Sequence, residues 1–209
     1  MKETVVLLHG LWMKSVVMQP LATRLRQAGF TTRCFSYPSV QTSPSGNAGL
    51  LHDFLLPLQT ERLHFVAHSL GGIVLLHYFQ QFNEVRPGRV VMLGTPVAGS
   101  AHARKISQLP FSELSLGKSI EQGLLGGVPA WTGGRDLGMI AGTRGFGFGN
   151  LMGRSEGIND GAVYLDETRI PGLTDHISLA VSHSAMLLSR KVADQTIHFL
   201  KNGYFSVTP

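Results

Sequence analysis

Cysteine and long apolar runs are both scarce in this sequence of 209 residues. The one cysteine, Cys34, excludes an internal disulfide and fits a reducing compartment, and we interpret it as a core-facing strand residue and not as a nucleophile. No apolar segment is long enough to span a membrane, and residues 1–3 lead directly into a strand-like run instead of a signal-peptide core. We therefore expect a cytoplasmic protein without a transmembrane segment.

Charged residues are also few, at 15% of the chain against 43% hydrophobic residues. Without a linker or an internal repeat, this balance predicts one domain over residues 1–209 with a sizeable core. The net charge is +5, but the basic residues are scattered and not interleaved with aromatic residues, so nucleic-acid binding has little support. A solvated surface is the preferred interpretation, and a peripheral contact with lipid stays open.

Spacings typical of metal ligands are missing as well. His64 and His68 are four residues apart, but in a predicted strand and not on a helix. The sequence contains neither His-Glu-x-x-His nor paired cysteines. We therefore expect no metal site.

Short β-rich runs alternate with segments of helical periodicity along the whole chain. The predicted strands are residues 4–8, 30–37, 64–69, 90–93, 137–141 and 175–181. The predicted helices lie around residues 17–28, 50–55, 73–82 and 189–200. This alternation predicts an α/β fold in three layers, in which a mainly parallel sheet of about six strands carries helices on both faces.

Residues 63–72 form an apolar run that ends in Ser69 and continues with glycines. We interpret the run as a strand driven into a sharp turn, because Ala67 and Gly71 leave room where larger side chains would collide with the following helix. Such a turn makes a serine hydroxyl a nucleophile. The pattern alone is common, and an ordinary turn with a surface serine is the alternative, so the context decides.

A second signal is the His-Gly pair directly after the first predicted strand. Acyl transfer needs preorganised backbone N–H groups for the negative charge of the tetrahedral intermediate, worth on the order of 3 kcal/mol each. We expect one such group from Leu70 and one from the loop after the first strand, with Leu11 as first choice and Trp12 as second. His9 is expected to hold this loop by hydrogen bonds and not to act as a base.

A nucleophilic serine also needs a base to take its proton and a carboxylate to orient that base. Among the nine histidines, His183 is best placed, because it follows the last predicted strand at the edge where open α/β sheets place their ligands. Asp160 is the preferred acid, since an Asn-Asp-Gly sequence puts it in a flexible turn after a predicted strand, although an Asp-Gly pair can also simply mark a turn. The other aspartates between the serine and the histidine are Asp136, Asp166 and Asp175.

The order Ser69, Asp160, His183 is that of the α/β-hydrolases, and the chain resembles small members of the lipase and esterase type, close to the short bacterial lipase-like family. The resemblance covers nearly the whole chain and implies a triad of these three residues, hydrolysis of carboxylic esters and no cofactor. The motifs that carry it are Leu7-Leu8-His9-Gly10, Ala67-His68-Ser69-Leu70-Gly71-Gly72, Leu93-Gly94-Thr95-Pro96, Asn159-Asp160-Gly161-Ala162-Val163 and Val181-Ser182-His183-Ser184.

Two positions depart from the pattern of this family. Ala67 stands where the first glycine of the turn is usual, as in some short lipases, and leaves the turn intact. Residues 97–100 stand where related lipases often carry histidine or asparagine, which leaves the contacts with substrate open.

Residues 99–161 are the least regular part of the sequence, and 14 of the 25 glycines lie between Gly117 and Gly161. In a lipase-like fold such an insertion commonly covers the active site, so we interpret it as a small lid or acyl-pocket wall. Its apolar side chains either line an acyl pocket or pack a satellite core, and the sequence favours neither. These side chains are Phe111, Leu114, Leu116, Leu124, Leu125, Trp131, Phe146, Phe148, Leu151 and Met152.

The sequence thus predicts a serine hydrolase that cleaves a small-molecule ester or a lipid through an acyl-enzyme. An acyltransferase or thioesterase with the same triad is the alternative among enzymes. A noncatalytic binding protein is the alternative outside them, because a fold alone does not decide function. The natural substrate and the oligomeric state stay open.

Overall fold

The computed structural model describes residues 3–110, 115–145 and 157–206. Six strands of this part form one sheet in the order β2-β1-β3-β4-β5-β6, and every pairing between them is parallel. They are β1 (Glu3–Leu8), β2 (Thr31–Phe35), β3 (Arg62–His68), β4 (Val90–Leu93), β5 (Leu137–Gly142) and β6 (Asp175–Leu179). The predicted α/β fold with a parallel sheet of about six strands is therefore confirmed.

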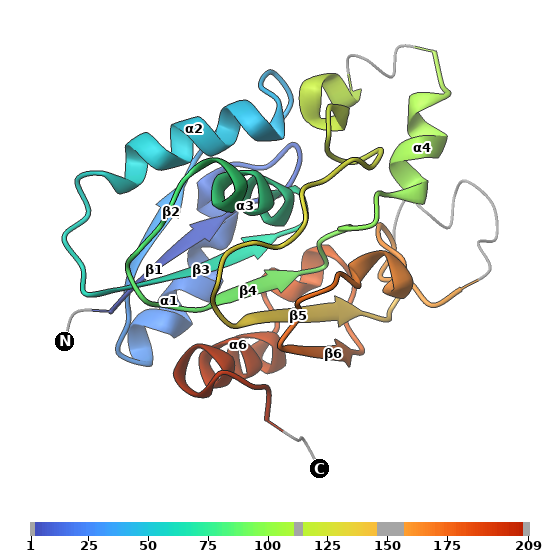
Figure 1. Cartoon of the computed structure of the whole chain (residues 1–209). Coiled ribbons are helices and arrows are strands. Elements are labelled where there is room, and N and C mark those ends of the chain that lie inside the picture. Colours follow the sequence, from blue (N-terminus) through green and yellow to red (C-terminus); the bar gives the residue numbers. More distant parts are fainter. Residues whose placement is uncertain (1–2, 111–114, 146–156, 207–209) are drawn as a thin grey trace.

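Helices cover both faces of the sheet (Figure 1). On one face lie α2 (Pro44–Leu55) and α3 (Leu70–Gln81), and on the other lie α1 (Gln19–Gln27) and α6 (Arg190–Asn202). The short helix α4 (Ala101–Ser107) follows β4 beyond the carboxyl ends of the strands. The 3-10 turns are η1 (Ser15–Met18), η2 (Gly117–Ile120), η4 (Leu165–Thr168) and η5 (Ser184–Leu187).

Alternate residues of the central strands pack under the two helical layers. In β1, Val6 and Leu8 belong to the apolar cluster that contains residues of α2 and α3. Val5 and Leu7 belong to the cluster that contains residues of α1 and α6. This alternation with a period of two is expected of a parallel strand that is buried on both faces.

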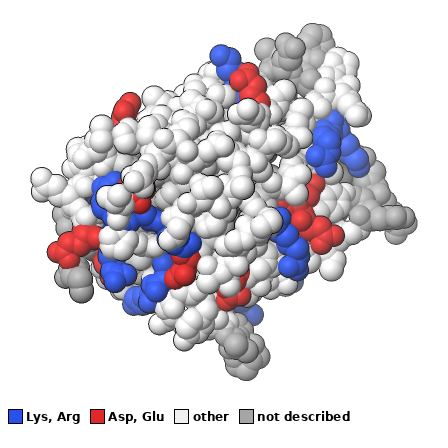
Figure 2. All heavy atoms as spheres, in the orientation of Figure 1, with Lys and Arg blue, Asp and Glu red and all other residues white. Residues whose placement is uncertain are grey.

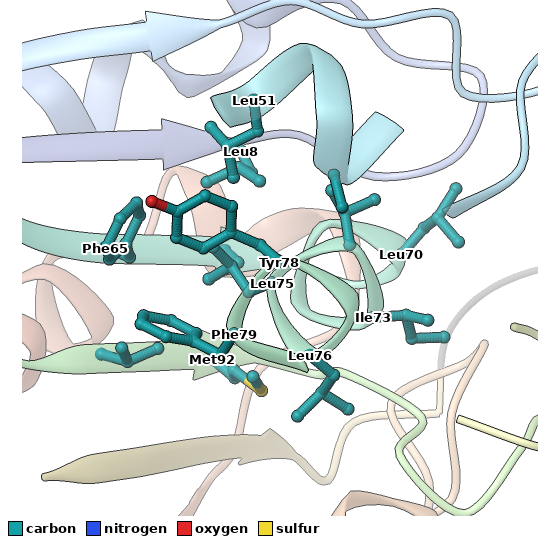
Figure 3. Packing of buried hydrophobic residues seen from close by; sticks show 14 of the residues in the cluster. Leu8, Leu51, Phe65, Leu70, Ile73, Leu75, Leu76, Tyr78, Phe79 and Met92 are labelled. Atoms are coloured by element: carbon teal, nitrogen blue, oxygen red, sulfur yellow. The ribbon is translucent and has the colours of Figure 1, made fainter. Parts of the chain in front are cut away.

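The helix α3 is buried without interruption from Leu70 to Phe79, which accounts for its continuous apolar sequence. Figure 3 shows its aromatic residues lying over the strands, with the ring centroid of Phe79 5.6 Å from that of Phe65 in β3. Because Ser69 directly precedes α3, this packing ties the position of Ser69 to the core.

The helix α2 begins earlier than the apolar pattern at residues 50–55 indicates. Ser43 caps it by accepting the Gly46 N–H at 3.2 Å, and Pro44 occupies the first turn, where a helix needs no donor. The first turn thus depends on a cap and a proline and not on apolar periodicity, so the periodicity did not reveal it.

The segment 99–161 supplies a strand of the sheet and also the helix α4 beyond the carboxyl ends of the strands. Its strand β5 lies between β4 and β6. Leu116 and Leu124 are buried in the cluster beneath α2 and α3, and Leu125 and Trp131 pack against it, so these four side chains pack the core. The other apolar residues considered for an acyl pocket lie outside the described residues, namely Phe111, Leu114, Phe146, Phe148, Leu151 and Met152. A covering role for this segment stays a prediction.

Cys34 lies in β2 as predicted, but this strand is at the edge of the sheet and the residue is only partly buried. Burial raises the pKa of the Cys34 thiol, which disfavours the nucleophilic thiolate.

On the face drawn in Figure 2, basic side chains lie next to acidic ones and do not form one continuous basic patch. Within residues 3–110, 115–145 and 157–206, no helix is both long enough and apolar enough to cross a membrane.

Candidate active site

Ser69 lies in a sharp turn between β3 and α3. Its backbone has φ 54° and ψ −123°, and Trp12 and Gln122 are the other non-glycine residues of the described chain with positive φ. Such a conformation costs about 1–3 kcal/mol and persists only where the surroundings hold it. Here the Ser69 N–H donates to Leu93 O at 2.9 Å, and Ser69 O accepts the Gly72 N–H at 3.0 Å. The predicted strand, turn and helix are therefore present, with Ser69 partly exposed between buried neighbours.

The glycines after Ser69 permit the close approach of α3 to the strands. A Cβ atom at Gly71 would lie 2.8 Å from His9 O and 2.9 Å from Leu8 Cβ. A Cβ atom at Gly72 would overlap the side chain of Thr95. Larger side chains would therefore push the helix away from β1 and from the end of β4.

The backbone N–H groups of Leu70 and Leu11 lie near Ser69 and have no hydrogen-bond acceptor within the part of the chain that the structure describes. Leu70 is the first residue of α3, and the first N–H groups of a helix have no partner inside it. Leu11 belongs to the loop after β1, which passes beside the serine, since a Cβ atom at Gly10 would lie 3.1 Å from Ser69 Cβ. Both groups are thus free to bind a negatively charged oxygen.

Trp12, the second choice for that role, already donates its N–H to Ser39 Oγ at 3.1 Å. Its indole N–H donates to Ser115 O at 2.5 Å, while 62% of the residue stays exposed. Trp12 thus links the loop after β1 to two other segments, and Leu11 remains the residue of this pair with a free N–H.

His9 holds this loop, as expected from the sequence. Its Nδ1 donates to Gly10 O at 2.8 Å, so its Nε2 accepts the Tyr37 N–H at 3.3 Å. The ring stacks on Tyr37 with centroids 4.2 Å apart. Burial lowers the pKa of His9, which keeps the ring neutral in this structural role.

His183 and Asp160 are in direct hydrogen-bond contact, with His183 Nδ1 2.8 Å from Asp160 Oδ2. Asp160 is only 1% exposed, and its Oδ1 accepts the N–H groups of Ala162 at 3.0 Å and Val163 at 2.8 Å. The Asp160 carbonyl accepts the His183 N–H at 2.9 Å. The turn predicted to be flexible is therefore a buried, hydrogen-bonded turn, because its carboxylate needs donors once it is removed from water.

The other three aspartates between Ser69 and His183 have different partners. Asp136 accepts from Arg89 Nε at 2.9 Å, and Asp175 accepts the Phe205 N–H at 2.7 Å. Asp166 lies in the first turn of η4. Of the four, Asp160 is the one with a hydrogen bond to His183 in the described chain.

Gly94, at the end of β4, provides the space in which this pair sits. The strands β4 and β5 lie between β3, which carries Ser69, and β6, which precedes His183, so the loop of His183 must reach back across them. Gly94 has φ +57°, and a Cβ atom there would lie 3.0 Å from Asp160 Oδ2 and 3.1 Å from His183 Nδ1. The glycine of the Leu-Gly-Thr-Pro motif is therefore required sterically, because a larger residue would meet His183 and Asp160.

Replacing Gly94 with alanine is expected to lower kcat for an ester about tenfold. The added methyl group must displace His183 and Asp160 by a few tenths of an ångström. A displacement of about 1 Å between reacting groups lowers the rate about 10²-fold, so this smaller displacement should cost less. Gly29→Ala is the matched control, since Gly29 also has positive φ but a Cβ atom there meets nothing within 4 Å. Steady-state kinetics should show a loss of kcat in Gly94→Ala alone. Urea unfolding should show a loss of stability in both variants from the positive φ, with a larger loss in Gly94→Ala because its methyl group also meets the pair. Equal kcat values would contradict this account.

His68 is a site residue that sequence reasoning missed, because it was considered only as a metal ligand. It is fully buried, and its Nε2 donates to His183 O at 3.0 Å. The two rings lie with centroids 4.6 Å apart. Burial and the neighbouring His183 lower the pKa of His68 to about 3, so the ring is neutral. The one signal in the sequence is its place directly before Ser69.

Glu167 is a second residue that the sequence did not single out. Its Oε1 accepts the Ala101 N–H at the start of α4 at 2.5 Å, and its Oε2 accepts the Tyr164 N–H at 2.9 Å. Burial raises the pKa of its carboxyl group. Glu167 thus connects the segment after Asp160 to the segment after β4.

At the carboxyl edge of the sheet, the imidazole of His183 and the buried carboxylate of Asp160 are in contact, while the hydroxyl of Ser69 forms no hydrogen bond with His183 among the described residues. This combination can perform nucleophilic and general acid–base chemistry. Among the residues that the structure describes, no group of three or more His, Cys, Asp and Glu side chains is arranged to hold a metal ion.

Several solved structures share this fold. The mature lipase BlEst2 from Bacillus licheniformis is 20% identical with a TM-score of 0.75, over 97% of this chain and 92% of that one. The metagenomic carboxyl esterase MGS0156 is 18% identical with a TM-score of 0.67, over 88% and 65%. Carboxylesterase CesB from Bacillus subtilis is 13% identical with a TM-score of 0.65, over 97% and 84%. At such identities the likeness shows the fold.

A comparison with curated protein sequences finds no match. The sequence model described as the alpha/beta hydrolase family matches residues 5–193, which is most of the chain. This match agrees with the parallel sheet and with the strained turn at Ser69. The chain therefore belongs to the alpha/beta hydrolase family.

Proposed function

We propose that the protein is a serine hydrolase of carboxylic esters, in which Ser69 is the nucleophile, His183 the general base and Asp160 the acid that orients the base. The observation that carries the proposal is the 2.8 Å hydrogen bond between His183 Nδ1 and the buried Asp160 Oδ2. An ionised carboxylate only accepts, so Nδ1 carries the proton and Nε2 is the nitrogen that can take one from a hydroxyl.

In the first half of the proposed reaction, His183 Nε2 removes the proton of the Ser69 hydroxyl as Oγ attacks the ester carbonyl carbon. The carbonyl oxygen becomes negatively charged and accepts hydrogen bonds from the N–H groups of Leu70 and Leu11, which have no other acceptor in the described chain. The tetrahedral intermediate then collapses. The bond to the alcohol breaks, His183 gives its proton to the leaving oxygen, and the acyl group stays on Ser69 Oγ.

In the second half, a water molecule replaces the alcohol. His183 Nε2 takes a proton from the water as its oxygen attacks the acyl carbon, and the same two N–H groups bind the second oxyanion. Collapse breaks the bond to Ser69, and the proton on His183 returns to Oγ. The products are a carboxylic acid and the free enzyme.

An ester as the substrate class is supported by the proteins that share the fold, which include a lipase, a carboxyl esterase and a carboxylesterase. The same chemistry serves acyl transfer to another alcohol. Product analysis of a p-nitrophenyl ester reaction with added alcohols separates the two, because a hydrolase yields mainly the free acid and an acyltransferase mainly the new ester.

Labelling with a fluorophosphonate, which reacts with activated serines, tests the proposal. We expect stoichiometric modification of the wild type at Ser69 by peptide mapping, and labelling at least about 10²-fold slower in His183→Ala, because general-base catalysis contributes about 10²–10⁴-fold. A folded wild type that is not labelled and does not hydrolyse p-nitrophenyl esters would refute the proposal and favour a noncatalytic binding protein.

A further inference from the structure

His183 and Ser69 follow strands that are not neighbours in the sheet. It follows β6, an edge strand, whereas Ser69 follows β3, and β4 and β5 lie between these two strands. A displacement of about 1 Å between reacting groups costs about 10²-fold in rate. The contacts that hold His183 therefore bear directly on any reaction at Ser69.

Three polar groups of His183 are held by hydrogen bonds. Its N–H donates to Asp160 O at 2.9 Å and its Nδ1 to Asp160 Oδ2 at 2.8 Å. Its carbonyl accepts from His68 Nε2 at 3.0 Å. Among the described residues, this last bond is the one hydrogen bond that joins His183 to β3, the strand that ends directly before Ser69.

The state of the His68 ring follows from this bond. A carbonyl oxygen only accepts, so Nε2 carries the hydrogen atom and Nδ1 does not. His68 Nδ1 is buried without a partner, and a Cβ atom at Gly10 would lie 3.0 Å from it. The ring therefore fills the space between the loop after β1 and the loop of His183. Since its centroid is 4.6 Å from that of His183, a charge on both rings at once would be repulsive.

We propose that His68 is a positioning residue, whose Nε2–H fixes the His183 carbonyl and thereby keeps the His183 ring in place beside Ser69. The inference rests on the proposed function, because it assigns His183 as the base. Supporting groups of this kind commonly decide whether a catalytic side chain is held within a productive geometry.

Two variants of matched shape test the proposal, His68→Gln and His68→Met. Glutamine offers an N–H donor at a reach similar to Nε2, and methionine has nearly the same shape without a donor. We expect His68→Met to lower kcat for a p-nitrophenyl ester about 10- to 100-fold with KM changed less than about twofold. His68→Gln should keep kcat within about threefold of the wild type. If packing alone matters, the two variants will have similar kcat values, which would overturn the proposal.

A readout without turnover separates this proposal from the proposed function. In proton NMR of the resting protein, the Nδ1–H resonance of His183 should broaden or disappear in His68→Met and persist in His68→Gln. If the wild type hydrolyses esters but neither kcat nor this resonance changes in His68→Met, the positioning role is wrong. If the wild type is inactive while the resonance responds as expected, the proposed function fails and the link through His68 stands. Should His68→Met not fold, His68→Asn, whose amide is too short to reach the carbonyl, takes its place in the comparison.

Discussion

Replacing Ser69 with alanine is expected to lower kcat for ester hydrolysis by about 10⁶-fold, the order of loss seen when a triad serine is removed. Alanine removes the nucleophilic oxygen and leaves His183 and Asp160 in contact, so the remaining catalysis comes from binding and the oxyanion donors. KM should change little, because the hydroxyl is needed for the reaction and not for binding. The measurement is steady-state kinetics with a p-nitrophenyl ester at high enzyme concentration.

The control for this prediction is Ser184→Ala. Ser184 is an exposed serine next to His183, so the same chemical change is made beside the site without removing the proposed nucleophile. We expect kcat within about twofold of the wild type. A Ser69→Ala protein that retains about a tenth of wild-type kcat would show that another group is the nucleophile.

Replacing Asp160 with asparagine is expected to lower kcat by about 10⁴-fold, as for an asparagine in place of a triad aspartate elsewhere. The asparagine amide can donate to His183 Nδ1, which then loses its proton to Nε2, so the ring can no longer accept a proton from Ser69. Asp160 Oδ1 accepts two N–H groups, so the asparagine is expected to place its carbonyl oxygen there and its NH2 group toward His183 Nδ1. Steady-state kinetics and near-ultraviolet circular dichroism distinguish loss of chemistry from loss of the fold.

Asp166→Asn and Asp136→Asn complete this comparison. Asp136 pairs with Arg89, and its replacement should reduce the free energy of unfolding by about 1 kcal/mol, because the Asp136 side chain is 43% exposed and Arg89 keeps its hydrogen bonds to two backbone carbonyls. Neither variant should change kcat more than about threefold. A large loss of kcat in Asp166→Asn together with an active Asp160→Asn would assign the acid to Asp166 instead.

Local patterns were enough to predict much of the fold. Short apolar runs bounded by polar turns predicted the strands, because a parallel strand with both faces covered must be apolar throughout. The structure confirms the parallel sheet and its helices on both faces. The start of α2 was missed, since it depends on the Ser43 cap and on Pro44 more than on a repeating apolar face.

The candidate site was also predicted in part from local sequence. Ser69 was predicted from its neighbours in the sequence, because the small residues that its turn needs, Ala67 and Gly71, lie within two positions of it. Asp160 was preferred among four aspartates by its turn sequence, and the structure brings it to 2.8 Å from His183. Their catalytic roles remain the proposal that the variants above test.

What the sequence by itself determined is the set of strands and helices, the sharp turn at Ser69 and the small group of residues worth testing, because each is encoded by side chains close together in the chain. Tertiary structure alone decided which aspartate contacts His183, that Trp12 has no free N–H, and that His68 binds a carbonyl 115 residues away. These are contacts between distant segments. Their geometry depends on how the strands pair in the sheet. The residues next to His68 in the sequence therefore do not indicate which carbonyl its side chain contacts.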